Sequence, residues 1–346
     1  MADHILITQG GLFSTLQDRG RRGYQRYGIS ASGAMDMLSL ATANTLVGNP
    51  LDMAAIEMTF TGVAARVDAP ACRVSIAGAE GPITVNGKAA DGYTSLDLER
   101  GDVLEIGTFR TGVRAYLAVQ GGFDIPPTLG SLSTHSRSGI GGLNGRALIS
   151  GDRLPLRPSL PSGPRLALPP PRRPDWSGPI RVVLGPQADM FSQAGIDTFL
   201  NSTYRVSQKT DRMGCQLDGP SIAHADGFNI ISDGIMNGSV QVPGHGRPIV
   251  LLADRQSTGG YPKIATVIEA DLPRIAQRRP GEEIRFQQVP IEQAVEITRQ
   301  YRAQLQGMAD RLEPVVEGVF GLTSERLLAA NLISGVHSAS APAAQE

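Results

Sequence analysis

A proline-rich stretch between residues 155 and 179 divides this chain of 346 residues into two parts. It contains nine prolines, at positions 155, 158, 161, 164, 169, 170, 171, 174 and 179. Because proline lacks a backbone N–H and fixes φ, such a stretch favours extended polyproline geometry over helix or central strand. We therefore expect an N-terminal domain over residues 1–155, a semi-rigid connector over 156–179 and a C-terminal domain over 180–310.

Both parts show short apolar runs separated by turn residues, the pattern of β-strands. Glycine and proline together make up 65 of 346 residues (41 and 24), which suits short strands joined by turns. Asn86-Gly87 between two such runs predicts a tight hairpin, because both residues tolerate positive φ. The predicted strands are 5–8, 54–60, 73–76, 83–85, 96–98, 103–106, 114–119, 180–184, 204–207, 229–232, 239–242, 249–253, 264–268 and 284–288.

Three segments break the strand pattern and predict helices. Residues 32–48 are rich in Ala, Met and Leu, and we expect Ser32 to cap that helix and Gly48 to end it. Residues 191–200 predict a short helix. Residues 291–308 predict a longer one, with Ile291, Val295, Thr298, Tyr301 and Leu305 on one stripe. The extension over 311–346 ends in a small, polar tail from 337, which we expect to be disordered. The fold class is therefore mainly β with a few helices, each half a barrel or sandwich.

Charge and composition exclude several classes of protein. Lysine and arginine number 32 against 33 aspartates and glutamates, so no net field favours nucleic acid or an anionic membrane. Two cysteines, Cys72 and Cys215, make no disulfide framework and indicate a reducing compartment. The first residues lack the pattern of a signal peptide, and no apolar run approaches the ~18 residues of a membrane span. We expect a cytoplasmic protein.

Several familiar site motifs are missing. There is no P-loop, and the glycine run 139–145 has Asn144 where the dinucleotide fingerprint needs glycine. The five histidines show no metal-ligand spacing, so we expect no metal bound by the chain alone. Ser257 lacks the preceding glycine of a nucleophile elbow. Residues 34–37 outwardly resemble a biotin-attachment tetrapeptide, but Asp36 stands where the acceptor lysine must be, so no covalent biotin is expected.

Two clusters in the first half combine glycine with polar residues. In the segment 17–24, Arg21 lies between two glycines that allow close backbone approach, so its guanidinium could bind a carboxylate or phosphate; a solvated basic turn is the simpler alternative. In the predicted helix, Asp36 and Asn44 are eight positions apart and share one face, where they could hold an amide. Asp36 could equally serve only the helix N-terminus.

Two further clusters have a similar composition. The glycine- and hydroxyl-rich stretch 130–146 offers backbone N–H groups for an anion, or is simply a mobile loop. Residues 254–263 lie between two apolar strands and suit the mouth of a site, with Lys263 as a compact positive charge. An exposed lysine at a strand end is the alternative. The candidate binding residues in or beside this segment are Gln256, Thr258, Tyr261 and Arg212.

These clusters, in this order, resemble the biotin-dependent carboxyltransferase or allophanate hydrolase subunit 2 family, which includes KipA-like proteins and one of the subunits of bacterial ATP-dependent 5-oxoprolinases. The resemblance runs from Gly11 to about Phe286. The marks that carry it are Gln17-Asp18-x-Gly20-Arg21-x-Gly23, Ser32-Gly33-Ala34-Met35-Asp36, Asn44, Gly48-Asn49, Ile56-Glu57, Gln120-Gly121-Gly122, Gly130-Ser131 to Thr134, Gly145-Arg146, Gly151-Asp152, Gly185-Pro186-Gln187, Asp211-Arg212-Met213-Gly214, Gln241-Val242-Pro243 and Thr258-Gly259-Gly260-Tyr261-Pro262. His135 within the Ser-Thr stretch departs from the pattern, and the helix and tail beyond Pro290 lie outside it.

The resemblance implies two cyclophilin-like β-barrel domains and a partner similar to allophanate hydrolase subunit 1, the subunit-B-like protein. In related urea carboxylases this region moves a carboxyl group from carboxybiotin to urea. There the aspartate matching Asp36 is expected to hold the substrate nitrogen, and the lysine matching Lys263 to meet the carboxyl donor. We assign these two residues the catalytic roles, and Arg21, Asn44, Gln256, Thr258, Tyr261 and Arg212 the binding of substrate.

Three functions follow from the resemblance. The first is cleavage of 5-oxoproline to glutamate as the C subunit of an ATP-dependent 5-oxoprolinase, with ATP and its Mg²⁺ as co-substrate, a subunit-B-like partner and a possible subunit-A-like one. The second is carboxyl transfer to urea or a similar amide from biotin carried in trans. The third is a KipA-like regulatory protein that binds a partner without catalysis. Replacing Asp36 and Lys263 by alanine separates the third from the others, because a binding protein should keep its partner affinity.

Overall fold

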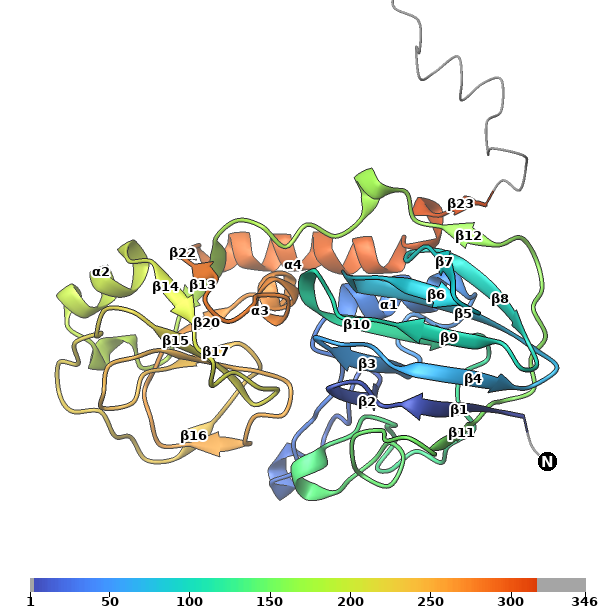
Figure 1. The fold of residues 1–346 in the computed structure, drawn as a ribbon. Coiled ribbons are helices and arrows are strands. Elements are labelled where there is room, and N and C mark those ends of the chain that lie inside the picture. Colours follow the sequence, from blue (N-terminus) through green and yellow to red (C-terminus); the bar gives the residue numbers. More distant parts are fainter. Residues whose placement is uncertain (1–2, 316–346) are drawn as a thin grey trace, which may run out of the picture.

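The computed structural model describes residues 3–315. Two sheets form the N-terminal half, in the orders β11-β1-β4-β9-β6-β7 and β2-β3-β10-β5-β8 (Figure 1). The apolar faces of the two sheets pack on each other, with Ile7, Leu16, Ile56 and Leu117 fully buried between them. The first sheet consists of β1 (His4–Gln9), β4 (Ala64–Asp68), β6 (Ile83–Val85), β7 (Lys88–Ala90), β9 (Val103–Ile106) and β11 (Arg153–Pro155). The second consists of β2 (Phe13–Gln17), β3 (Ala55–Thr59), β5 (Ala71–Glu80), β8 (Ser95–Glu99) and β10 (Thr111–Val119).

Helix α1 (Met37–Leu46) covers the outer face of the second sheet, where it packs on β5 and β10. Its Leu40 and Ala43 are buried against Tyr116 and Ala118. The helix begins five residues later than the sequence predicted, and Asp36, not Ser32, caps it. The reason is local: Ser32 and Gly33 have φ of 52° and 97°, left-handed values that cannot belong to a right-handed helix.

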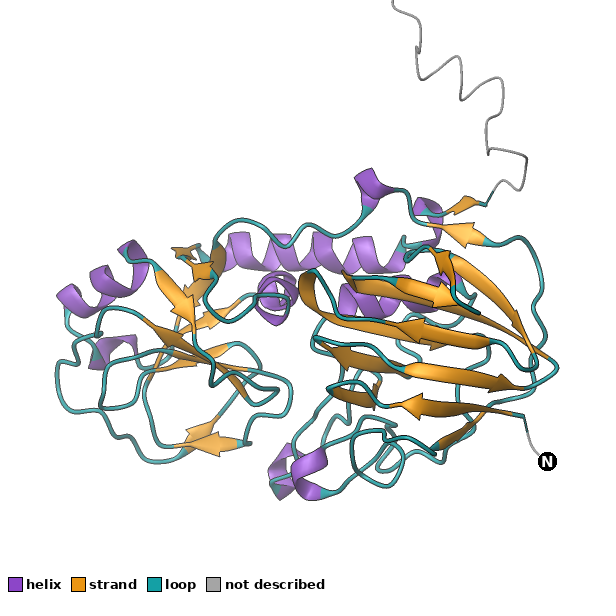
Figure 2. Ribbon diagram, viewed as in Figure 1, coloured by secondary structure: helices purple, strands orange, loops and turns teal. Residues whose placement is uncertain are grey.

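The C-terminal half is built on an eight-stranded sheet in the order β21-β14-β15-β18-β17-β20-β13-β22, which wraps around its core as a nearly closed barrel (Figure 2). Phe199, Tyr204 and Phe286 pack together in that core. The strands are β13 (Ile180–Leu184), β14 (Tyr204–Val206), β15 (Gly214–Asp218), β17 (Ser239–Gln241), β18 (Ile249–Leu251), β20 (Lys263–Val267), β21 (Glu283–Ile284) and β22 (Phe286–Gln288). The short helices are α2 (Gln193–Asn201) and α3 (Leu272–Ala276).

Helix α4 (Ile291–Gln306) runs along the same side of both halves (Figure 1). Its predicted apolar stripe is only half right. Tyr301 is buried and Leu305 packs beside it, but the side chains of Ile291 and Val295 at the first turns are 60% and 44% exposed. Beyond α4, β23 (Glu313–Pro314) pairs with β12 (Leu166–Ala167) of the connector. The connector therefore lies along the protein surface, held at its middle by a two-stranded sheet.

The prediction of a mainly β fold with a few helices is confirmed. The hairpin at Asn86-Gly87 is confirmed too, with β6 and β7 antiparallel on either side. The predicted strand 229–232 is wrong: these residues have no regular structure, and the nearest strand is β16 (Asp233–Gly234), which pairs with β19 (Thr258–Gly259).

The predicted disordered tail lies outside the described residues. Within the described part of the chain, no helix is long and apolar enough to cross a membrane.

Replacing Gly87 by alanine should lower the free energy of unfolding by about 1–2 kcal/mol, because its φ of 74° is left-handed. Apart from Gly87 and its two chain neighbours, no described residue has an atom within 4 Å of the added Cβ, so backbone strain sets the cost. Gly234→Ala is the matched control, since its Cβ also meets open space and its φ is ordinary. Urea denaturation measures both. Equal losses in the two variants would contradict the turn assignment.

The two thiols are buried and free, at Cys72 and Cys215. Burial raises the pKa of each to about 12, helped at Cys72 by the nearby carboxylates of Asp102 and Asp97. Because the thiolate is the reactive form, neither should react with Ellman's reagent at pH 8 in the native protein. Two equivalents should react once the chain is unfolded in guanidinium. Fast labelling of either thiol before unfolding would show that this part of the core is open.

Candidate functional site

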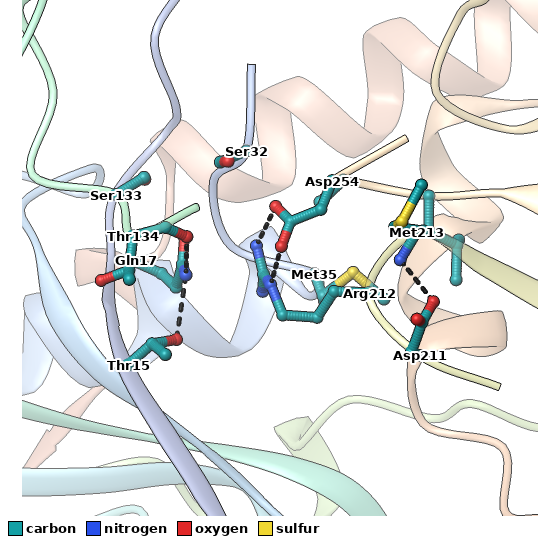
Figure 3. Close-up of polar contacts among 12 residues, drawn as sticks. Thr15, Gln17, Ser32, Met35, Ser133, Thr134, Asp211, Arg212, Met213 and Asp254 are labelled. Atoms are coloured by element: carbon teal, nitrogen blue, oxygen red, sulfur yellow. Dashed lines mark hydrogen bonds and ion pairs between the residues drawn. The ribbon is translucent and has the colours of Figure 1, made fainter. Parts of the chain in front are cut away.

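A buried ion-pair cluster joins the two halves, and Arg212 is at its centre (Figure 3). Its Nε and Nη2 donate to both carboxylate oxygens of Asp254, at 2.8 and 3.0 Å. The same guanidinium reaches across to the N-terminal half, where Nη2 donates to the Gly33 carbonyl at 2.7 Å and Nη1 to Oε1 of Glu57. The flat, forked shape of arginine allows this three-sided contact. Arg212 therefore connects the halves by charge as well as by packing.

Glu57 lies in the middle of β3 and is 1% exposed. Its Oε2 accepts from the Tyr116 hydroxyl at 2.6 Å and from the Met35 amide at 2.9 Å. Arg114 adds a second cation 3.9 Å from Oε1. Two guanidiniums thus face two carboxylates, Glu57 and Asp254, so the buried cluster is neutral overall. A buried charge is tolerated only when it is paired in this way.

Asp36 lies directly behind this cluster and is fully buried. Its Oδ1 accepts from the Leu38 and Ser39 amides, both at 3.0 Å, which is the helix cap. Its Oδ2 accepts from the Ser39 hydroxyl at 2.6 Å and from Nε2 of Gln277 in the other half at 2.8 Å. Both oxygens therefore have partners within the protein, and the capping role that the sequence left open is present.

Burial acts on the pKa values of these groups in opposite directions. Burial raises the pKa of Asp36 above its ordinary value, although the hydrogen bonds from Gln277 and Ser39 work against it. Burial alone would lower the pKa of Arg212, but the carboxylates of Asp254 and Glu57 outweigh it and raise the pKa. Burial also raises the pKa of Tyr116, beside Glu57, well above normal. Arg212 stays charged and Tyr116 stays a neutral donor at physiological pH.

A cavity of about 280 Å³ opens beside the cluster, between the halves. Arg212, Asp254 and Arg114 form polar parts of its wall, and Met213 and Phe60 are among its apolar parts. Arg137 and Asp211, one from each half, also line it and form an exposed ion pair at 3.2 Å. Asp36 does not line the cavity but supports its wall. Gln277, which binds Asp36, also accepts through Oε1 from the backbone amides of Val113 and Arg114, at 2.8 and 2.9 Å.

Arg21 is 1% exposed, so it is not the solvated turn that its sequence also allowed. Its Nη2 donates to the Ser133 carbonyl, while Nε and Nη1 have no hydrogen-bond partner among the described residues. Burial lowers its pKa, and the charges of Asp18 and Asp254 partly offset this. The Ser-rich stretch wraps around the neighbouring Asp18, whose Oδ1 accepts from the hydroxyls of Ser131 and Ser133, both at 2.6 Å.

Asn44 is fully buried and bonded to backbone rather than facing a cavity. Its Nδ2 donates to the Met53 carbonyl at 2.7 Å, and its Oδ1 accepts from Asn49 at 3.2 Å. Asn49 in turn bonds the Val119 carbonyl at 2.8 Å. Asn44 therefore fixes the turn after α1 to the sheet. None of these hydrogen bonds tests its predicted contact with substrate, which stays a prediction.

Lys263 lies at the start of β20 and is 3% exposed. Its Nζ donates to Oδ2 of Asp233 at 2.7 Å. Gln256, Thr258 and Tyr261 are on the segment that runs from Asp254, at the cavity, to Lys263, and all three are exposed. No hydrogen bond or ion pair of the described residues links Lys263 to Asp36, and neither lines the interlobe cavity. Their joint action on one substrate stays a prediction.

Of the predicted binding residues, the structure brings Arg212 to the interlobe cavity and Arg21 within the electrostatic reach of its Asp254. The sequence reasoning missed Glu57, Arg114, Tyr116 and Gln277 as members of the cluster. A signal existed for two of them: Glu57 and Arg114 each interrupt an apolar strand, where a charge needs a buried partner.

Among residues 3–315, no group of three or more His, Cys, Asp or Glu side chains could hold a metal ion.

Comparisons with known proteins agree on one family. The family model described as "Carboxyltransferase domain, subdomain A and B" matches residues 27–288. The C subunit of the 5-oxoprolinase of Escherichia coli (strain K12) is 37% identical over 89% of this chain and 98% of its own length. The urea amidolyase of Lachancea kluyveri is 33% identical over 89% of this chain, which corresponds to 18% of that protein.

Solved structures agree with the sequence relatives. The crystal structure of the Kluyveromyces lactis urea amidolyase superposes with a TM-score of 0.82 at 28% identity, covering 93% of this chain and 20% of that one. The urea carboxylase of the same yeast superposes with the same TM-score and covers 30% of that chain. The chain thus spans about a fifth to a third of these larger structures. Because the family model matches residues 27–288 and the relatives above agree with it, the chain belongs to the family of carboxyltransferase domains with subdomains A and B.

Proposed function

We propose that this chain is the C subunit of an ATP-dependent 5-oxoprolinase, which opens 5-oxoproline to L-glutamate together with a subunit-B-like partner. The observation that carries the proposal is the interlobe cavity, whose wall combines a neutral buried ion-pair cluster with apolar side chains. A small pocket with few, well-placed polar groups suits a small amide. The 37% identity to the C subunit of a 5-oxoprolinase, over 98% of that protein, supports this substrate over urea.

The chemistry explains why ATP is needed. A lactam is a poor electrophile, and transfer of the γ-phosphoryl group of ATP to its carbonyl oxygen activates the carbon and releases ADP. Water then adds to that carbon, the C–N bond breaks, and the ring nitrogen leaves as the amine with a proton. The resulting acyl phosphate reacts with a second water to give glutamate and phosphate. Two waters and one ATP are consumed for each glutamate.

Residues of this chain would bind and orient the lactam in this sequence. Arg137 and Arg278 line the cavity and could pair with the substrate carboxylate, because their side chains are not held in the buried cluster. Asp36 would act as a positioning residue, since Gln277 connects it to the Val113–Arg114 wall. Lys263 would stabilise phosphoryl oxygens only if the 254–263 segment moves, because its charge is now paired with Asp233. The nucleotide and its Mg²⁺ are assigned to the partner, since this chain has no P-loop.

Carboxyl transfer to urea from biotin carried in trans is the second candidate. The superposition on urea amidolyase at a TM-score of 0.82 favours it. Asp36 stands where an acceptor lysine would have to be, so the biotin would come from another protein.

The two candidates predict different products from one set of purified proteins. The chain is mixed with its subunit-A-like and subunit-B-like partners, ATP, Mg²⁺ and 5-oxoproline, and glutamate is measured. In parallel, urea-dependent loss of carboxybiotin is followed with a biotin carrier protein. We expect glutamate in the first assay and no urea-dependent loss in the second. The reverse pattern would replace the first proposal by the second.

A further inference from the structure

A second cavity, of about 320 Å³, lies on a different surface from the interlobe cavity. The connector, α3 and α4 surround it, and Leu38 of α1 contributes from the N-terminal half. Its volume is at the lower end of the ~300–1,000 Å³ that small-molecule sites occupy. It shares no lining residue with the interlobe cavity, so its chemistry can be considered separately.

Three arginines line this second cavity: Arg173, Arg181 and Arg274. Their side chains are sheltered but reachable, with 28%, 24% and 25% exposed. Each uses only part of its guanidinium inside the protein. Nη2 of Arg173, Nη1 of Arg181 and Nη2 of Arg274 have no hydrogen-bond partner among the described residues. Each of the three arginines that line the cavity therefore keeps one guanidinium nitrogen for a ligand, although Arg173 also lines a neighbouring cavity with Glu80 and Tyr93.

Internal ion pairs hold these arginines in place. Fully buried Asp271 binds Arg181 through both oxygens, at 2.9 and 2.6 Å, and lies 3.7 Å from Nε of Arg274. Arg173 pairs with Glu80 at 3.1 Å and lies over the ring of Tyr93. Arginines fixed in this way lose little side-chain entropy when they bind an anion, which favours affinity.

The remaining lining adds donors and little negative charge. Nε1 of Trp176 is buried without a hydrogen-bond partner in the described part of the chain, and Gln304 offers a side-chain amide. Among the described residues that line the cavity, Asp175 is the one acidic side chain, and its two oxygens accept from the amide and hydroxyl of Ser177, both at 2.8 Å. Asp271 and Glu80 balance part of the arginine charge, and the N–H groups that remain around the space favour a ligand with several acceptor oxygens and negative charge.

We propose that this cavity is a second binding site, which takes a small multivalent anion with phosphate-like or dicarboxylate chemistry. The site bridges the halves, since Arg173 is held by Glu80 of the first half and Arg181 and Arg274 by Asp271 of the second. It also adjoins the interlobe contact, because the Leu38 amide binds Asp36 and α3 leads directly into Gln277. Occupancy of the site should therefore stabilise the two halves as one unit.

Trp176 makes the test direct, because it is the single tryptophan of the sequence. Inorganic phosphate and succinate are titrated separately into the full chain while Trp176 fluorescence is followed, with sodium chloride at matched ionic strength as the control. We expect a saturable change with one of the two anions and none with chloride, and the responding anion identifies the chemistry. The assay needs no partner and no substrate, so it is independent of the proposed 5-oxoprolinase activity.

A matched pair of variants on α4 tests the location. Gln304→Glu places a negative charge in the cavity and should weaken binding of the anion roughly tenfold, because the carboxylate repels the anion and competes for the arginines. Gln306→Glu adds the same charge two residues away, outside the cavity, and should leave the affinity unchanged. Arg274→Gln should weaken binding similarly, with circular dichroism confirming that it folds. No saturable response to either anion, or equal effects of the two glutamate variants, would overturn the proposal.

Discussion

Replacing Arg212 by methionine is expected to lower the free energy of unfolding by about 3–5 kcal/mol. The loss arises because the buried carboxylate of Asp254 would lose its ion pair, and Glu57 would keep only Arg114, 3.9 Å from its Oε1. Methionine fills much of the same space, so the effect of lost packing stays small. Equilibrium denaturation in urea gives the change.

Two comparisons show whether charge is the cause. Arg205→Met removes an exposed ion pair with Glu283, which should cost less than about 1 kcal/mol. Adding Asp254→Asn to Arg212→Met removes the unpaired carboxylate, keeps Glu57 paired with Arg114, and should recover part of the lost stability. If Arg212→Met costs no more than Arg205→Met, the cluster does not hold the halves together.

Replacing Met213 by tryptophan is expected to reduce glutamate formation by the reconstituted assembly at least about 100-fold. Met213 lines the interlobe cavity and is only partly buried, so the larger ring can fill that space with little strain. A ligand displaced or misplaced by about an ångström loses most of the benefit of orientation, which accounts for an effect of this size. Initial rates at several 5-oxoproline concentrations measure it.

The control for this variant is Leu160→Trp, on the connector, where Leu160 is 69% exposed. It adds a tryptophan outside the lining of either cavity and should keep the activity of the parent protein. Urea denaturation of Met213→Trp should give a free energy of unfolding within about 1 kcal/mol of the parent. If the Met213→Trp assembly forms glutamate at the rate of the parent, the substrate does not bind in the interlobe cavity.

Most of the predicted strands and the hairpin are confirmed because their signals are local: alternating apolar runs, and a turn dipeptide that tolerates positive φ. The prediction failed at 229–232 and missed β2, β4 and β15. The start of α1 could not be predicted, since residues 30–36 offer several caps, and the left-handed φ values of Ser32 and Gly33 that leave Asp36 as the cap are seen only in the structure. Ile291 and Val295 fit a helical stripe, yet they are exposed because the early turns of α4 pack on the protein through Ala294 and Ile297 instead.

The site was less predictable than the fold for the same reason. Glu57 and Arg114 were recognisable as charges within apolar strands, but nothing in the sequence identifies Arg212 as the partner that joins them across the halves. The pairing of Lys263 with Asp233 likewise depends on the β16–β19 contact of two loops. A sequence pattern shows that a buried charge needs a partner, but only the folded structure shows which residue is that partner.

The most direct test of the central claim is where the lactam binds, and methyl NMR can measure it. The chain is labelled with ¹³C at the methionine methyl groups, assembled with its partners, and titrated with 5-oxoproline. We expect the Met213 resonance, at the interlobe cavity, to shift with saturation, and that of exposed Met236, near Asp233, to stay unchanged. A shift at Met236 with none at Met213 would place the substrate on the 254–263 segment and contradict the assignment of the cavity.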